Sequence, residues 1–203
     1  MNEKELAPCI IVYENAFKPG NFLELLEEEC KQQWGYLSWY LTYVGGAGQQ
    51  KQRVDYRSSL ACELGPIGQP IEDISEPRIV PLAQKWQEIH SDLQTVIWSY
   101  RNSYDIDVKE DEGFAVLKYS KGAEYRGHVD HAPSNERVFS IVAFANDNYE
   151  GGELHFPLFE TTVKPKAGSA VLFPSNFPYF HYASPVGASN SNDTKYSLVT
   201  WFR

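Results

Sequence analysis

The spacing of apolar residues along the chain changes near residue 113. Before this point apolar residues recur at helical spacing, and after it they alternate in short runs. The first helical stripe consists of Phe22, Leu26, Cys30 and Trp34, each four residues from the next. Positions spaced in this way fall on one face of a helix. The pattern predicts a short amphipathic helix.

A longer stripe starts at Ser75, and its members lie three or four residues apart. They are Ile79, Leu82, Trp86, Ile89, Leu93, Val96 and Tyr100. Pro77 suits the first turn of a helix, where its missing N–H is not needed. The pattern predicts a second helix, and we expect both helices to pack on a sheet formed by the second half of the chain.

Short apolar segments, separated by glycine, proline and asparagine, follow Gly113. They are FAVLKYS, ERVFSIVAFAN, GELHFP, ETTVKP, SAVLFP, YFHYAS and KYSLVTWFR. Short strands at close spacing are typical of a sandwich or barrel, of which the jelly roll commonly holds a metal. The run VFSIVAFA predicts a strand buried on both faces. We expect one domain over residues 1–203, with a helical and strand support region at 1–112 and a jelly-roll core at 113–203.

Composition limits the possible partners. The 18 basic and 27 acidic residues give 18 − 27 = −9, a charge that disfavours nucleic acid. The three cysteines are scattered without a C-x-x-C pair, which favours a reducing compartment. No secretory signal or membrane-spanning apolar run is visible. We expect a cytoplasmic protein without a nucleic-acid or membrane partner, and its oligomeric state stays open.

Candidate metal ligands occur in the segment YSKGAEYRGHVDH, residues 119–131. Side chains two apart on a strand share a face, so His128 and Asp130 can bind one ion. Because a His-x-Asp pair is common by chance, a third ligand is needed, and His181 on a later predicted strand is the best candidate. Two imidazoles and one carboxylate are typical of non-haem Fe(II) oxygenases, and zinc accepts the same ligands less distinctively.

The last predicted strand carries polar residues in apolar surroundings. Strand alternation places Lys195, Ser197, Val199 and Trp201 on one face. A lysine and a serine inside a barrel are costly unless an anion meets them. A bound dicarboxylate would satisfy both residues.

Five blocks of the second half, in their order along the chain, resemble the 2-oxoglutarate and Fe(II)-dependent dioxygenases, and most closely their prolyl 4-hydroxylase branch. These blocks are LKYSKGAEYRGHVD, YEGGELHFP, KAGSAVLFPS, the His181 strand and KYSLVTWF. The resemblance spans about residues 8–203. It implies an α+β, mainly β fold: a double-stranded β-helix (jelly-roll or cupin-like) core backed by N-terminal helices. It also implies that His128, Asp130 and His181 hold Fe(II).

The same resemblance implies further roles. The cosubstrate 2-oxoglutarate is assigned to Tyr119, Lys195 and Ser197, with Lys195 on its distal carboxylate. The peptide substrate is assigned to Arg57, Ser59, Tyr125 and Trp201. From the residues alone, Tyr119 also fits core filling, Arg57 a solvated surface charge and Trp201 a barrel cap. His131 and His155 receive no role.

One departure from the family pattern concerns Phe144-Ala145-Asn146, where relatives usually carry Tyr-Leu-Asn. The change removes a hydroxyl that some relatives direct at the cosubstrate. The connection between His181 and Lys195 is also longer than usual. Both changes leave the fold and cosubstrate expectations in place and bear on the identity of the substrate.

The resemblance predicts hydroxylation of a prolyl residue in a protein or peptide. The reaction consumes O₂ and 2-oxoglutarate, releases succinate and CO₂, and can use ascorbate as a reductant. The Gly/Gln-rich segment 42–56 is a candidate lid that excludes water from the reaction. Two alternatives stay open: oxidative demethylation of nucleobases, and a non-catalytic jelly-roll binding module.

Overall fold

The computed structural model describes residues 1–44, 52–63, 77–108, 110–134, 136–164, 166–187 and 193–203. Its helices are α1 (Phe22–Cys30), α2 (Val80–Tyr104) and the short 3-10 helix η1 (Pro157–Phe159). The strands of the first half are β1 (Asn2–Ala7), β2 (Ile10–Glu14), β3 (Tyr40–Leu41) and β4 (Leu60–Cys62). Those of the second half are β5 (Ala115–Tyr119), β6 (Tyr125–His128), β7 (Phe139–Phe144), β8 (Leu154–Phe156), β9 (Thr161–Val163), β10 (Ser169–Pro174), β11 (His181–Ala183) and β12 (Lys195–Phe202).

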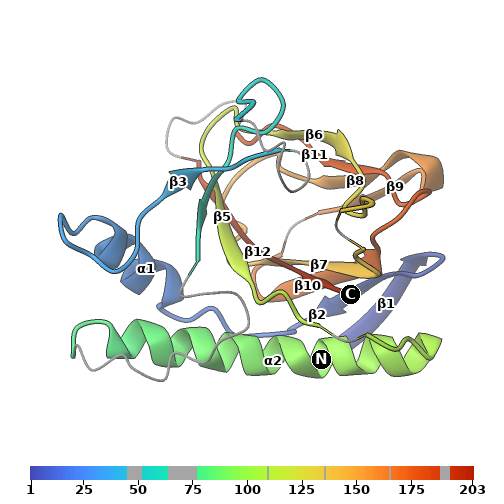
Figure 1. Ribbon diagram of the computed structural model, residues 1–203, viewed down its shortest axis with the longest axis horizontal. Helices are drawn as coiled ribbons and strands as arrows, with labels where there is room; N and C mark the ends of the chain where they lie inside the picture. Colours follow the sequence, from blue (N-terminus) through green and yellow to red (C-terminus); the bar gives the residue numbers. More distant parts are fainter. Residues whose placement is uncertain (45–51, 64–76, 109, 135, 165, 188–192) are drawn as a thin grey trace.

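The strands form two antiparallel sheets that face each other (Figure 1). The larger sheet has the order β1-β2-β10-β7-β12-β5-β4-β3, and the smaller has the order β6-β11-β8-β9. Strands from β5 onward are distributed between the two sheets in the manner of a double-stranded β-helix. The mainly β fold expected from the sequence is therefore confirmed.

The helices cover the outer face of the larger sheet, with α2 running along it (Figure 1). All seven predicted stripe residues from Ile79 to Tyr100 are buried in this layer. Trp86 stacks on Phe114 with ring centroids 4.5 Å apart, which fixes the helix against the chain that leads into β5. Each fully buried side chain of this size contributes about 1.5–3 kcal/mol, so the stripe is a major part of the core.

The helix ends differ from the sequence expectation. α1 ends at Cys30, and Trp34 is 86% exposed instead of completing the stripe. The chain turns here because Gln32 N–H bonds the Glu29 carbonyl oxygen and Tyr36 N–H bonds the Glu29 carboxylate. Pro77 precedes α2, and Pro81 is the proline in its first turn. The predicted start at Ser75 lies outside the described residues.

The first half also supplies strands that were not expected individually. β2 pairs with β10, and β1 extends the sheet beyond β2. On the other side, β4 pairs with β5. The predicted division at residue 113 stays a prediction. Neither described α-helix combines the length and apolar character that a membrane crossing requires.

Two interior strands confirm the patterns assigned to them. β7, which covers Phe139–Phe144 of the run VFSIVAFA, lies between β10 and β12 and is buried along most of its length, whereas Val138 before it is exposed. β12 directs alternate residues to opposite faces. Leu198 and Phe202 enter the core under the helices, and the face that starts with Lys195 turns toward the smaller sheet. The alternation therefore delivers the polar residues of β12 to the space between the sheets.

Candidate metal and cosubstrate site

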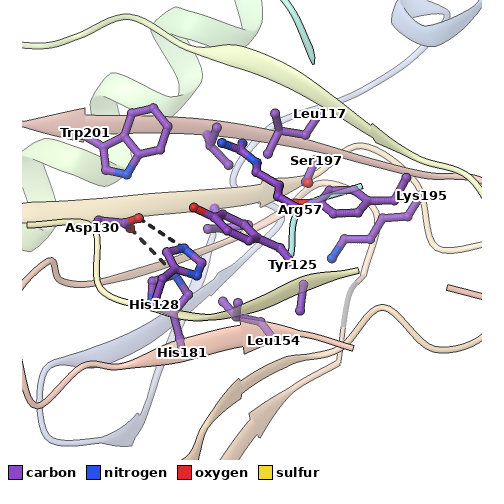
Figure 2. Close-up of a pocket in the computed structure, with 14 residues that line it drawn as sticks. Arg57, Leu117, Tyr125, His128, Asp130, Leu154, His181, Lys195, Ser197 and Trp201 are labelled. Carbon is purple, nitrogen blue, oxygen red and sulfur yellow. Dashed lines mark ion pairs between the residues drawn. The ribbon is translucent and has the colours of Figure 1, made fainter. Parts of the chain in front are cut away.

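A pocket between the two sheets brings the three predicted metal ligands together (Figure 2). His128 is the last residue of β6, Asp130 follows two residues later, and His181 begins β11. β6 and β11 are paired with His128 opposite His181. One ligand atom from each of the three residues lies within 4.8 Å of the others. The strand register thus converts distant positions into one cluster.

The orientation of the two imidazoles fits a metal ion. His128 Nδ1 lies 2.8 Å from the Arg126 carbonyl oxygen, and His181 Nδ1 lies 3.0 Å from that of Tyr179. Nδ1 can donate to these carbonyl oxygens, which leaves the Nε2 lone pair of each ring free. The Nε2 atoms lie 3.4 Å and 3.8 Å from the Asp130 oxygens. With bonds of about 2.1 Å, neighbouring ligands of one ion lie roughly 3 Å apart, so small adjustments suffice.

The protonation states also favour metal binding. Burial, reinforced by the nearby charge of His128, lowers the pKa of His181 to about 4, so its ring is neutral at pH 7. Burial acts to raise the pKa of Asp130, but His181, His128 and a hydrogen bond from Ser140 outweigh it and hold that pKa well below its usual range. A neutral imidazole and an ionised carboxylate are the forms that bind a cation.

Two serines that the sequence interpretation missed hold Asp130 in place. Ser140 Oγ donates to Asp130 Oδ2 at 2.6 Å and lies 2.7 Å from Ser175 Oγ. Asp130 N–H also bonds the Ser175 carbonyl oxygen at 3.1 Å. Ser140 is the single polar residue in the apolar run of β7, and this interruption was the available signal.

A buried ammonium group lies at the end of the pocket away from the triad (Figure 2). Lys195 is 2% exposed, and its Nζ donates to the Gly152 carbonyl oxygen at 2.6 Å. In the described part of the chain, no carboxylate oxygen lies within 4.0 Å of this nitrogen. Burial lowers the pKa of Lys195 to about 7. An anion that enters the pocket would give this group the partner it lacks.

The other two predicted cosubstrate residues line the same pocket. Tyr119 is 3% exposed and lies opposite Lys195 on the neighbouring strand β5, and Ser197 is 2% exposed and lies two residues after Lys195 on β12. Burial raises the pKa of Tyr119, so the phenol keeps the proton that it would donate. The Phe144 ring centre lies 5.5 Å from Lys195 Nζ, so an apolar ring lies beside the ammonium group.

Three of the four predicted substrate residues line the pocket. The Arg57 guanidinium lies over the Tyr125 ring at 4.5 Å, and Tyr125 stacks on His128 with centroids 3.7 Å apart. These side chains form a continuous stack that ends at the metal ligand (Figure 2). Ser59 is fully buried, and its Oγ accepts from Arg57 Nε at 3.3 Å. Ser59 therefore lies behind Arg57 and does not line the pocket.

Trp201, the fourth of these residues, is held by a pair that the sequence interpretation missed. The Arg137 guanidinium lies 3.6 Å from the centre of the indole. Arg137 also forms two hydrogen bonds to the Glu112 carboxylate, at 3.0 Å and 2.6 Å. All three side chains line a groove that extends from the pocket along the protein surface. The indole is therefore fixed at the mouth of the pocket.

The candidate lid cannot be placed. Its centre, residues 45–51, lies outside the described residues. The flanking residues Tyr43, Val44 and Tyr56 line the groove outside the pocket. Its role as a lid stays a prediction.

The chain is similar to known proteins over this region. Residues 114–203 match the family "2OG-Fe(II) oxygenase superfamily". A protein of Arabidopsis thaliana described as "Probable prolyl 4-hydroxylase 9" is 33% identical over 90 residues, which cover 33% of this chain and 31% of that protein. The chain thus matches about a third of the length of this relative.

Solved structures share the fold over nearly the whole chain. The viral collagen prolyl hydroxylase of Paramecium Bursaria Chlorella virus-1, in its 2OG complex, has a TM-score of 0.63 at 18% identity, covering 98% of this chain and 99% of that one. A Pseudomonas putida prolyl-4-hydroxylase has a TM-score of 0.64 at 21% identity, and the match covers 96% of this chain and 92% of that one. A Trichoplax adhaerens prolyl hydroxylase, in complex with a peptide of hypoxia inducible factor, has a TM-score of 0.70 at 16% identity. The match covers 96% of this chain and 83% of that one.

All three triad residues and Lys195 lie inside the matched segment. His128, His181 and Lys195 lie on β6, β11 and β12, and Asp130 follows the end of β6 by two residues. The segment 114–203 is therefore a 2OG-Fe(II) oxygenase segment, and the chain around it has a prolyl 4-hydroxylase-like fold.

Proposed function

We propose that the protein is a 2-oxoglutarate- and Fe(II)-dependent dioxygenase that hydroxylates a prolyl residue in a protein or peptide. One observation carries the proposal: a metal-binding triad lies at one end of the pocket, and at the other end lies a buried lysine that has no acidic partner among the described residues. A molecule with one end that chelates a metal and a carboxylate at the other end matches this arrangement. 2-Oxoglutarate is such a molecule.

Different residues of the pocket would bind the metal ion and the cosubstrate. His128, Asp130 and His181 would hold the ion, and Lys195 and Tyr119 would bind the distal carboxylate. When bound, Fe(II) supplies the redox chemistry by which O₂ and 2-oxoglutarate give one oxygen atom to the substrate and one to succinate, with release of CO₂. The apolar walls of the pocket limit the access of water, which strengthens the ionic contact at Lys195.

The substrate side of the proposal rests on the mouth of the pocket. Tyr125, Trp201 and Arg57 surround the opening closest to the triad. Rigid aromatic rings and an arginine are typical of sites that bind peptides. We propose a proline-containing partner that enters by the groove, and the cytoplasm as the compartment.

Turnover tests this function directly. The purified protein with Fe(II), ascorbate, O₂ and 2-oxoglutarate is expected to form succinate, and a panel of proline-containing peptides is expected to include one that gains a single oxygen atom on proline by mass spectrometry. A gain of oxygen on another residue type would replace proline as the target. Absence of both succinate and 2-oxoglutarate binding would favour a binding module.

The depressed pKa of Lys195 predicts that cosubstrate binding depends on pH. A bound carboxylate stabilises the ammonium form, so above pH 7 binding must take up the proton that the free pocket has released. The affinity for 2-oxoglutarate is expected to fall by up to about tenfold for each pH unit above 7. Calorimetry at pH 8 in two buffers of different ionisation enthalpy measures the uptake. Binding without proton uptake would contradict this assignment.

The same pKa predicts the pH dependence of stability without ligand. Between pH 7 and the ordinary lysine pKa of 10.5, the unfolded chain holds a proton that the folded chain has lost. The contribution of Lys195 to stability therefore rises with pH across this window, and its penalty is fully present below pH 7.

Arg137→Lys is expected to raise the KM for the peptide by about tenfold, because lysine loses the planar stack on Trp201 and the paired hydrogen bonds to Glu112. The KM for 2-oxoglutarate should not change, since Arg137 lies outside the cosubstrate end of the pocket. Steady-state kinetics with each substrate varied in turn measures both. Arg126→Lys, at an exposed arginine, is the matched control. Equal changes in both KM values would show a general disturbance instead.

A further inference from the structure

Two of the three cysteines, which are far apart in the sequence, come together on the far side of the larger sheet from the pocket. Cys30 is the last residue of α1, and Cys62 is the last residue of β4. Their Sγ atoms lie 3.9 Å apart. Cys30 is half-buried and Cys62 is 1% exposed. The fold therefore presents one accessible thiol with a second thiol directly behind it.

The surroundings of the pair favour reaction at Cys30. The hydrogen bond from the Cys62 thiol lowers the pKa of Cys30. Burial and the carboxylates of Glu27 and Glu29 oppose this effect, and the Lys118 ammonium adds to it. The same contact and burial raise the pKa of Cys62. The thiolate is the nucleophilic form of cysteine, and oxidants act on thiolates that solvent can reach.

We infer that Cys30 and Cys62 form a two-electron redox site that closes to a disulfide in response to hydrogen peroxide. In the first step the Cys30 sulfur attacks the peroxide O–O bond, forms a sulfenic acid and releases water. In the second step the Cys62 sulfur attacks the sulfenic sulfur, the S–S bond forms and a second water leaves. Two thiols and one hydrogen peroxide thus give one disulfide and two waters.

The required movement is small and lies at a helix end. A disulfide has an S–S distance of about 2.05 Å, so the two sulfurs must approach by roughly 2 Å. Cys30 is followed by an irregular segment instead of another helical turn, and side-chain rotation of Cys30 can supply much of the approach. The bond would fix the end of α1 to β4, which pairs with β5 through Cys62 and Val116.

Cys9 provides an internal control. It lies in the turn between β1 and β2, and its neighbours there include Tyr104 and Tyr179 instead of a second cysteine. An oxidant that attacks any accessible thiol would also consume Cys9. If oxidation depends on two adjacent thiols, the Cys9 thiol should remain free.

Thiol counting after treatment of the folded protein with a few equivalents of hydrogen peroxide tests the inference. The wild type is expected to fall from three free thiols to one, the Cys9→Ser variant from two to none, and dithiothreitol should restore both. Peptide mapping should find Cys30 joined to Cys62 within one chain. The Cys62→Ala variant should stop at a sulfenic acid on Cys30 that dimedone traps.

Other outcomes would overturn the inference. They are loss of the Cys9 thiol at the same rate as the pair, a disulfide between two chains, or three thiols that persist in a protein whose circular dichroism shows it to be folded. None of these measurements involves iron or 2-oxoglutarate. The redox site and the proposed oxygenase activity can therefore fail separately.

Discussion

Replacement of His128 or Asp130 by alanine is expected to reduce succinate formation at least about a hundredfold and to weaken Fe(II) binding strongly. Each residue supplies one of three ligand atoms, and two remaining ligands hold a divalent ion poorly. Anaerobic titration with Fe(II) and 2-oxoglutarate measures binding, because the chelated cosubstrate gives a weak visible absorption band. Succinate assays under air measure turnover.

A histidine outside the triad separates loss of a ligand from loss of a surface residue. His155 lies on the outer side of the smaller sheet, stacked on Tyr182, and is not among the pocket residues. His155→Ala should keep both the absorption band and turnover. Wild-type turnover in the His128 and Asp130 variants would end the proposal of an iron oxygenase.

Lys195→Met is expected to weaken 2-oxoglutarate binding by at least about a hundredfold, the cost of leaving a buried charge without its partner. The variant should fold as well as the wild type or better without ligand, because it removes a buried ammonium whose only described acceptor is a carbonyl oxygen. Thermal unfolding with and without 2-oxoglutarate measures both effects. The wild type should gain stability from the ligand, and the variant should not.

Lys121→Met serves as the matched control, because this lysine is exposed. It should respond to 2-oxoglutarate as the wild type does. A Lys195→Met variant with unchanged affinity would move the distal carboxylate to another part of the pocket, and Arg57 would be the next candidate to test.

The sequence was most informative where one strand carries the whole pattern. Alternation along β12 placed Lys195 and Trp201 on the pocket side, and the structure confirms this. The His-x-Asp pair was also visible, because its two members are neighbours in the chain. His181 was the best candidate for the third ligand because it lies on a later predicted strand, but local spacing does not show the pairing of β6 with β11 that brings it to His128.

Long-range contacts explain most of what was missed. Arg137 reads as an ordinary charged residue in sequence, and its role beside Trp201 depends on the segment that carries Glu112 lying against the end of β12. The proximity of Cys30 and Cys62 depends in the same way on the end of α1 coming close to the end of β4. Trp34 shows the opposite error, where helical spacing continued in the sequence after the backbone had turned away.

The proposed ligands of one small molecule belong to different layers of the protein. His128 and His181 stand on the smaller sheet, whose strands have three or four residues, and Tyr119 and Lys195 stand on the larger sheet. A molecule that contacts both the histidines of the smaller sheet and the residues of the larger sheet links the two sheets. Amide hydrogens of β6 and β11 should then exchange with solvent more slowly when such a molecule is bound, so binding at a lysine of the larger sheet would be measurable in the smaller sheet.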